Sequence, residues 1–365
     1  MLYLACDQHS KQITISLRDE SGTVLERRQV STRPEKCRAF LESVRQRAGE
    51  AGYLAIVEVC GFNDWFLALL SEMGCREIVL LHPEKKSRVK TDRRDADQLG
   101  ELLWVNRMRL ARGQQPRGLR RVAIPSAQDA ADRQLTAARQ RLGRRRTRTL
   151  NALQRILRKH NRQWEQPTKG FDTRAVRKWL WKLDLPEIDR LEMDQLLEEW
   201  NTWDLQVAAL EQAIAARAGV HEDMKLLLTI KGLGPYGALG LASRIGDIRR
   251  FPRPRSLANY FGLTPRCGNS GEKTDRLGSI TKRGSQFARF MLGQLVLHVL
   301  KRDPHLRTWY RRIRGRRGSK IARVAVMRRL CTIVWHMLTY REAYTPGGPP
   351  RLRERQRRKD QPWAA

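Results

Sequence analysis

The sequence lacks the features that would place this chain in a membrane, secreted or zinc-binding class. No apolar run reaches the roughly 18 residues that a membrane-spanning helix needs. The opening residues, MLYLACDQHS, have no basic segment before the apolar one, so no signal peptide is expected. The six cysteines are scattered, without a CxxC pair or a histidine at zinc-ligand spacing, which argues against a zinc finger or a disulfide framework. Together these absences predict a protein of the reducing cytoplasm, with no membrane partner.

Acidic residues are scarce in two stretches of an otherwise highly charged chain. The 365 residues include 72 Lys and Arg against 38 Asp and Glu, a formal net charge of +34. Residues 112–162 hold fifteen basic residues against two acids, and residues 301–360 hold nineteen against four. Residues 184–211 reverse the sign, with nine acids against Arg190 alone. Because a surplus that serves solubility would be spread evenly, this concentration predicts a polyanionic partner such as nucleic acid.

Alternating apolar residues predict an α/β domain at the N-terminus. Residues 2–31 have the pattern of three antiparallel strands joined by short turns. The elements predicted after them are a helix over 34–48, a strand over 54–59, a helix over 64–72, a strand over 77–81 and a helix over 91–106. Three strands, helix, strand, helix, strand, helix is the order of a ribonuclease-H-like domain. We expect this domain to span residues 1–110.

The middle of the chain, residues 111–220, is predicted to be a basic linker followed by a helical coiled-coil region. Two long helices are expected over 126–161 and 186–218. In the second helix an a/d seam is formed by Leu196, Trp200, Trp203, Val207, Leu210 and Ile214. The seam fits an intramolecular helical hairpin and a coiled-coil dimer about equally well.

The sequence LLLTIKGLGPYGALGLASRIG (226–246) has the form of a helix-hairpin-helix motif. Gly232 and Gly234 flank a hydrophobic residue in the turn, and the N–H groups at the start of the next helix can hold a phosphate without reading bases. A purely structural turn between two helices is the alternative. The motif belongs to a mostly helical C-terminal domain, 221–343, with apolar helices near 289–300 and 320–340. Residues 344–365 are expected to form a basic, disordered tail.

Four acids fall where the predicted topology would bring them together: Asp7, Glu58, Asp92 and Asp95. Asp7 ends the first strand, and Glu58 ends the fourth, where an acid between valines is costly unless it is paired or bound to metal. Asp92 and Asp95 are three residues apart and share one face of the last helix, whereas Asp97 is turned away from them. Each acid alone has an ordinary structural explanation, but converging carboxylates are what Mg²⁺ prefers in phosphodiester chemistry. The set therefore predicts a metal site.

Several segments of the chain together resemble a known family. In order, YLACDQHSK, IVEVCG, KTDRRDADQL and FPRPRSLANYFGLTPRCGNSG are similar to segments of transposases of the insertion-sequence one-ten family, the bridge-RNA-guided DEDD serine recombinases. The resemblance covers about residues 1–340 and leaves the basic tail unassigned. It implies a RuvC-like N-terminal domain whose four acids bind Mg²⁺ or Mn²⁺. It also implies a C-terminal transposase domain in which Ser270 is the catalytic nucleophile and forms a 5′-phosphoserine link to DNA.

The resemblance also implies partners. A structured noncoding RNA of the element, the bridge RNA, would pair with both donor and target DNA. The protein would act as a homo-oligomer, dimer or tetramer, with active sites shared between subunits, and would lie on the nucleoid of a prokaryotic cell when bound to DNA. Two other functions remain open from the residues alone. One is a metal-dependent junction nuclease that uses water, and the other is a non-catalytic basic RNA- or DNA-binding protein.

Basic residues beside these features are the expected nucleic-acid contacts. Ser270 lies between Asn269 and Gly271, and a glycine-flanked loop lets a hydroxyl approach a phosphate closely. The residues expected to hold phosphate near the serine and the acids are Arg266, Lys273, Lys282, Arg283, Lys90, Arg93 and Arg94. RNA scaffolding, or else nonspecific DNA contact, is expected of Arg144, Arg145, Arg146, Arg148, Arg311, Arg312, Arg316, Arg317 and Lys320.

Overall fold

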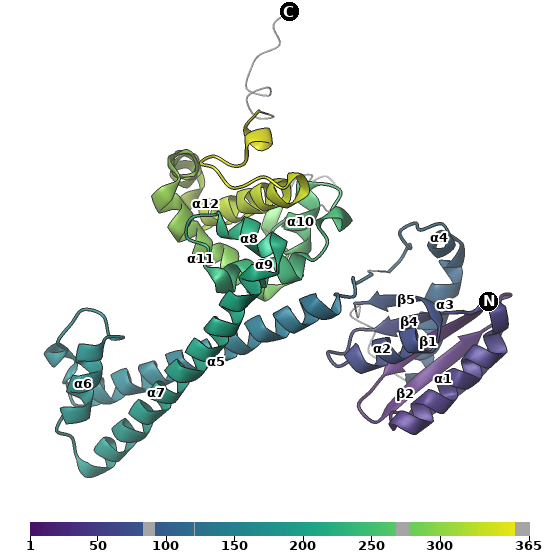
Figure 1. The fold of residues 1–365 in the computed structure, drawn as a ribbon, viewed down its shortest axis with the longest axis horizontal. Coiled ribbons are helices and arrows are strands. Elements are labelled where there is room, and N and C mark those ends of the chain that lie inside the picture. Colours follow the sequence, from purple (N-terminus) through teal and green to yellow (C-terminus); the bar gives the residue numbers. More distant parts are fainter. Residues whose placement is uncertain (83–91, 120, 268–276, 355–365) are drawn as a thin grey trace, which may run out of the picture. The chain divides into compact units, whose positions relative to one another are not determined.

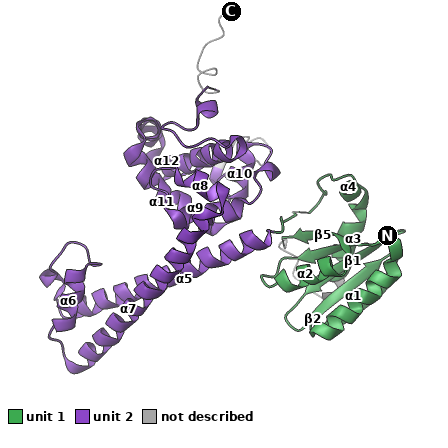
Figure 2. Ribbon diagram, viewed as in Figure 1, with its two compact units in different colours: residues 1–124 green, residues 125–365 purple. Residues whose placement is uncertain are grey.

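The computed structural model describes residues 1–82, 92–119, 121–267 and 277–354. It divides into two compact units, Met1–Ile124 and Pro125–Ala365 (Figures 1 and 2). Three residues with predicted roles lie outside the described residues: Lys90, Ser270 and Lys273. The backbone of a further three is described but their side chains are not: Asp92, Arg93 and Arg94. The roles proposed for these six residues therefore stay predictions.

Unit 1 is built on a five-stranded sheet with the strand order β3-β2-β1-β4-β5. The first three strands form an antiparallel meander, and β4 and β5 run parallel to β1. This confirms the predicted order of strands and helices, while the ribonuclease-H-like, or RuvC-like, assignment stays a prediction. The strands are β1 (Leu2–Gln8), β2 (Gln12–Arg18), β3 (Val24–Ser31), β4 (Tyr53–Glu58) and β5 (Cys75–Leu81).

Helices cover both faces of this sheet. They are α1 (Pro34–Ala48), α2 (Asp64–Glu72), α3 (Asp92–Val105) and α4 (Arg107–Ala111). Because side chains alternate along a strand, Leu4 and its even-numbered neighbours in β1 pack with α1 and α2. Tyr3 and Ala5 pack on the other face with Leu99 and Leu103 of α3. The odd-numbered positions of β1 therefore point toward α3.

Two long helices of unit 2, α5 (Ala127–Lys159) and α7 (Glu187–Ala216), form an antiparallel hairpin that carries α6 (Arg174–Lys182) near its turn (Figure 1). Trp200 of the predicted seam is fully buried in the core of this hairpin. Ion pairs join the two helices along their length: Arg139–Glu211, Arg146–Asp204, Arg155–Glu192 and Lys159–Asp189. The acids of residues 184–211 thus neutralise part of the charge of α5, and the two helices pack as an intramolecular hairpin.

The remainder of unit 2 is a helical core that, in its described part, also contains one short antiparallel pair of strands. Its elements are α8 (Glu222–Leu228), α9 (Pro235–Ile245), α10 (Pro254–Tyr260), β6 (Pro265–Cys267), β7 (Leu277–Ile280), α11 (Gln286–Arg302) and α12 (Pro304–Tyr340). Residues 344–354, predicted to be disordered, pack on this core. Leu352 is 4% exposed, and the Tyr344 hydroxyl donates to Asp303. No helix in the described ranges is long and apolar enough to cross a membrane.

α12 is longer than the sequence predicts and is broken within. Gly318 has a non-helical backbone with φ of 78°, so an arginine-rich first half is set off from a buried second half. The first half has no apolar stripe, which is why the sequence pattern marks a helix only from about residue 320. Arginine nevertheless forms helices well, and the segment is helical from Pro304.

Candidate active site and nucleic-acid pocket

Asp7 and Glu58 occupy adjacent positions at the ends of two parallel strands. The last paired residues of β1 and β4 are Cys6 and Val57, so each acid lies one residue further along. Both fall on the face of the sheet that α3 covers, because Ala5 and Ile56, two residues earlier, pack on that side. The sequence argument that placed these two acids together is therefore consistent with the register of the strands.

Asp95 lies in the first turn of α3 on the helix face that meets the sheet. It precedes Leu99 and Leu103 by four and eight residues, and both leucines pack on β1 and its neighbours. Asp95 is only 9% exposed, and Asp7 is equally buried. Asp7 Oδ2 lies 3.3 Å from His9 Nε2. We call Asp7, Glu58, Asp92 and Asp95 the acidic site.

Thr14 adds a hydroxyl to the acidic site. It is directly opposite Asp7 in the antiparallel β1–β2 pair, so both side chains lie on the α3 face. Thr14 is 2% exposed, and its Oγ1 has no hydrogen-bond partner among the described residues. A buried hydroxyl without a partner is costly. In the sequence, Thr14 alternates with Ile13 and Ile15 along a predicted strand, and this signal could have identified Thr14 as a residue of the same face.

A divalent cation fits the chemistry of these side chains. Carboxylates and a buried hydroxyl without a partner are hard oxygen ligands of the kind that Mg²⁺ and Mn²⁺ take. No group of three or more His, Cys, Asp or Glu side chains arranged to hold a metal is found within the described residues, which leave out the Asp92 side chain. The residues that would hold the ion are those of the acidic site.

Asp97 faces away from the acidic site and has a structural role. Its carboxylate accepts hydrogen bonds from Ser16 Oγ at 2.7 Å and from Arg27 Nε at 2.8 Å. Its backbone oxygen accepts another from Arg18 at 3.3 Å. These bonds fasten α3 to β2 and β3, which agrees with the expectation that Asp97 does not join Asp92 and Asp95.

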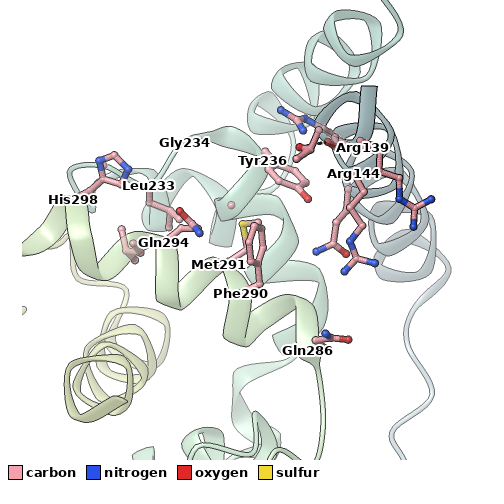
Figure 3. A pocket seen from close by; sticks show the side chains of 17 residues that line it. Arg139, Arg144, Leu233, Gly234, Tyr236, Gln286, Phe290, Met291, Gln294 and His298 are labelled. Carbon is pink, nitrogen blue, oxygen red and sulfur yellow. Dashed lines mark hydrogen bonds between the residues drawn. The ribbon is translucent and has the colours of Figure 1, made fainter. Parts of the chain in front are cut away.

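A pocket of about 800 Å³ lies between α5, α9 and α11 (Figure 3). α5 contributes arginines to one wall, the turn before α9 contributes Gly232 and Gly234, and Phe290 and His298 project from α11 (Figure 3). Burial raises the pKa of Tyr236, which also lines the pocket, to about 12, although the charges of nearby arginines oppose this shift. The fold thus brings together the α5 basic segment (Arg144, Arg145, Arg146 and Arg148) and the Gly-Leu-Gly turn, which the sequence suggested as two separate nucleic-acid contacts.

The arginines of the α5 basic segment divide into two groups. Arg146 binds Asp204 and Asp172, each at 2.5 Å, and Arg145 lies 5.4 Å from the centre of the Trp203 ring. Arg144 and Arg148 line the pocket and make no hydrogen bond or ion pair with any described residue. Among Arg144, Arg145, Arg146 and Arg148, these two cations are therefore the ones without an intramolecular partner in the described part of the chain.

Gly232 has a structural reason to be glycine. Its φ is 102°, and a Cβ there would lie 2.5 Å from His298 Cβ, so the turn rests directly on α11. At Gly234, which caps α9, a Cβ would meet nothing within 4 Å. The interpretation of Gly232–Gly234 as a helix-hairpin-helix motif stays a prediction, since a tight turn between helices accounts for its geometry.

The loop after β7 is held tightly against the end of α10. At Gly284 a Cβ would lie 2.0 Å from the Tyr260 carbonyl oxygen, and at Gly262 it would lie 2.0 Å from the Arg283 carbonyl oxygen. Lys282 has a φ of 55° and donates its N–H to the Gly262 oxygen at 3.1 Å. Two exposed cations, Lys282 and Arg283, are thereby fixed beside the β6–β7 pair, the strands that precede and follow Ser270.

Two protein-family models match the chain. A DEDD transposase model of the IS110 group matches residues 4–161, and the model described as the Transposase IS116/IS110/IS902 family matches residues 224–311. The first stretch contains the acidic site, and the second contains the pocket turn and Ser270. Together they cover more than half of the chain. This chain belongs to the IS110 family of transposases.

Several curated bacterial proteins are similar to this transposase. A probable family 20 transposase of Pseudomonas aeruginosa is 27% identical over 303 residues, 80% of this chain and 86% of its own length. The transposase for insertion sequence element IS1111A of Coxiella burnetii is 28% identical over 308 residues, 80% of this chain and 79% of its own. A pilin gene-inverting protein of Moraxella bovis is 30% identical over 130 residues, 35% of this chain and 40% of its own.

The remaining cations predicted for this transposase lie on its surface. Arg266 is exposed on β6, and the arginine-rich first half of α12 is exposed along most of its length. The side chains of this half make no ion pair with the described part of the chain. The predicted contacts in this half are Arg311, Arg312, Arg316 and Arg317, and Lys320 is exposed just after the break. As an insertion-sequence transposase, the protein is a DNA-processing enzyme.

Proposed function

We propose that this transposase is an RNA-guided DNA recombinase that cleaves and rejoins strands at the acidic site, with Ser270 as nucleophile. The observation that carries the proposal is the placement of Asp7 and Glu58 side by side on the α3 face, with Asp95 in the helix turn above that face. The hydroxyl of Thr14, buried on the same face without a partner, supports it. The family match supports the DNA substrate.

The proposed cleavage exchanges one phosphodiester for another. Ser270 Oγ bonds to phosphorus, the bond between phosphorus and the 3′ oxygen breaks, the serine proton leaves to solvent and the 3′ oxygen takes up a proton. A divalent cation held by the four carboxylates would supply charge stabilisation at the phosphate oxygens. In rejoining, a different 3′ hydroxyl attacks the phosphoserine and releases the serine, so no ATP is needed.

The chain's own residues would position the substrate for this exchange. The hydrophobic contacts of α3 hold Asp95 against the sheet, and His9 contacts Asp7 from the same sheet edge. Lys282 and Arg283, fixed by the tight loop after β7, would hold a phosphate near the serine. These cations lie within the same family match as Ser270.

We also propose the partners of the reaction. Arg144 and Arg148 in the pocket, together with the exposed first half of α12, would bind the backbone of a structured noncoding RNA or of the donor and target DNA. The transposase would act as a homo-oligomer, with the acidic site of one subunit and Ser270 of another forming one active site.

A strand-transfer assay with purified protein, donor, target and element RNA tests the nucleophile. We expect a protein–DNA adduct that survives denaturation, and its loss in Ser270→Ala. The alternative, a nuclease that activates water, predicts cleavage without an adduct. An adduct that persists in Ser270→Ala would exclude this serine as the nucleophile.

Mixing two inactive variants tests the shared active site. If the site is shared, Asp95→Asn subunits mixed with Ser270→Ala subunits regain part of the activity, because each mixed pair contains one intact site. If each subunit carries its own site, the mixture stays inactive. Omitting the RNA from the same reaction tests guidance: activity independent of RNA would contradict that part of the proposal.

A further inference from the structure

A second pocket, of about 620 Å³, opens between α10 and α12 and shares no lining residue with the α5–α9–α11 pocket. Its lining contains no aspartate or glutamate and four arginines: Arg253, Arg255, Arg328 and Arg329. Nothing in the sequence singles these residues out, because two lie beside prolines and two within an apolar helix. Only the packing of α10 on α12 brings them together.

The four guanidinium groups have no anionic partner in the described part of the chain: none of them makes an ion pair or a hydrogen bond there. Neighbouring arginines of the same helical core behave differently. Arg341 is paired with Asp223, and Arg351 with Glu342 at 3.1 Å. The fold therefore supplies an acid to each of these two arginines but to none of the four in the pocket, of which Arg329 is partly buried and the other three are exposed.

Arg329 is the most informative of the four. Burial lowers its pKa below the usual arginine range, and the charge of Asp303 opposes that shift. Asp303 does not pair with it, because its oxygens accept from the N–H of Leu306 at 3.0 Å, the N–H of Gly347 at 2.8 Å and the Tyr344 hydroxyl. A partly buried cation without a counterion is destabilising, and an anion entering the pocket would offset that cost.

We infer that the α10–α12 pocket binds a backbone phosphate of a single nucleic-acid strand. Arginine forks match phosphate oxygens bidentately, and the volume suits a nucleotide unit rather than a lone ion. Trp309, which also lines the pocket, offers a ring against which a base can stack. The inference rests on the proposed function for the presence of RNA and DNA strands, but not on the chemistry at the acidic site.

Binding measurements on the full-length protein test the pocket. Arg329→Met and Arg328→Gln each remove one pocket cation, and Arg323→Gln removes one exposed cation of the same helix that does not line it. The probes are a short single-stranded DNA, an RNA of the same sequence, and tripolyphosphate. Affinity is measured by fluorescence anisotropy across a range of salt concentrations, and the unfolding temperature by calorimetry.

We expect each pocket variant to weaken strand binding several-fold and to reduce the slope of log K against log salt by about 0.7, with little change in Arg323→Gln. Arg329→Met should unfold at or above the wild-type temperature, since it removes an uncompensated buried charge. A greater loss with RNA assigns the pocket to the guide, and a greater loss with DNA assigns it to the substrate.

The inference is overturned if the pocket variants bind strands no differently from Arg323→Gln, or if only tripolyphosphate binding changes. It is also overturned if Arg329→Met loses stability and binding in parallel, while Arg328→Gln binds normally. Cleavage is measured separately in the Asp95→Asn variant, which should lose cleavage activity but still bind strands. Failure of the proposed chemistry is thus distinguishable from failure of the pocket.

Discussion

Ser16 Oγ lies 2.7 Å from the Asp97 carboxylate and donates a hydrogen bond to it across the interface of β2 and α3. Two residues earlier in the same helix, Asp95 is 9% exposed and lies on the helix face whose leucines pack on the sheet. Two acids of similar charge and location thus differ: Asp97 holds the helix to the sheet, and Asp95 is proposed to act in the acidic site. Substituting each in turn separates structure from chemistry.

Asp95→Asn should lower metal-dependent strand cleavage about 100-fold or more, with little change in the unfolding temperature. Asp97→Asn should do the reverse, because it weakens the bonds to Ser16 and Arg27. We expect it to lower the free energy of unfolding by about 1–2 kcal/mol and to leave cleavage nearly unchanged. Rate measurements and urea denaturation check both, and equal rate losses would contradict the assignment.

Thr14→Val should stabilise the protein while impairing metal-dependent activity. The Thr14 hydroxyl is buried without a hydrogen-bond partner in the described structure, so removing it should raise the free energy of unfolding by about 1 kcal/mol. Thr136→Val is the control, because its buried hydroxyl donates to the Asp132 oxygen at 2.8 Å and accepts from Arg244 at 3.0 Å. The control should lose stability. A loss of stability in Thr14→Val would refute this assignment.

The paired variant Arg144→Gln/Arg148→Gln should weaken nucleic-acid binding without destabilising the fold. Each lost phosphate contact should reduce the salt slope by about 0.7–0.9. Arg146→Gln is the comparison, because it leaves Asp172 without its ion-pair partner at 2.5 Å. It should lower the unfolding temperature more than it lowers affinity. If the loss of binding per arginine is the same in the double variant and in Arg146→Gln, the effect is one of diffuse charge and not of a site.

Acid should loosen the α5–α7 hairpin through Asp204. Burial raises the pKa of Asp204, but hydrogen bonds from Arg146 and Arg177 outweigh burial and hold the pKa below its usual range. A carboxylate with a depressed pKa contributes stability that is complete above the unfolded-state value of about 3.9 and is lost as the pH falls through the lower folded value.

This pH dependence can be followed by tryptophan fluorescence, since Arg177 lies 4.0 Å from the centre of the Trp200 ring. We expect the unfolding temperature to fall as the pH drops below about 4. Asp204→Asn should be less stable at neutral pH and show a shallower fall in acid. An unchanged acid transition in this variant would show that other carboxylates control it.

Gly284→Ala should destabilise the C-terminal core by more than about 2 kcal/mol. Its φ is 91°, and the added Cβ would meet the Tyr260 carbonyl oxygen at 2.0 Å. Gly293→Ala is the matched control within α11, where a Cβ meets nothing within 4 Å. The control should gain up to about 1 kcal/mol because alanine favours a helix. Chemical denaturation distinguishes the two.

The sequence predicts unit 1 well because its signals are local. The local sequence pattern is strong enough that the helices Pro34–Ala48 and Asp64–Glu72 match their predicted bounds, although neither has a side-chain cap. Asp7 and Glu58 could be placed together because the carboxyl ends of neighbouring parallel strands always meet at one sheet edge. One inference about topology thus predicts that two residues distant in the chain lie close together.

Unit 2 is harder to predict because its sites depend on how helices dock. Arg144 and Gly232 line the same pocket only because α5 lies against α9, and no periodicity records that contact. The same holds for Arg329, which the helical pattern alone would leave as a solvent-exposed charge but which is partly buried in the α10–α12 pocket. Nor does composition separate Arg146 from Arg144, since their difference depends on Asp204 in another helix.

The backbone break at Gly318 has a consequence for how this protein can diverge over generations. Residues 314–317, just before it, are exposed, whereas Ala322, Val326 and Leu330 after it anchor the helix in the core. Substitutions at these exposed positions would alter the charge of this surface without transmitting strain to the anchored half. Natural selection can therefore adjust the charge of this surface in small steps while the folded core remains unaltered.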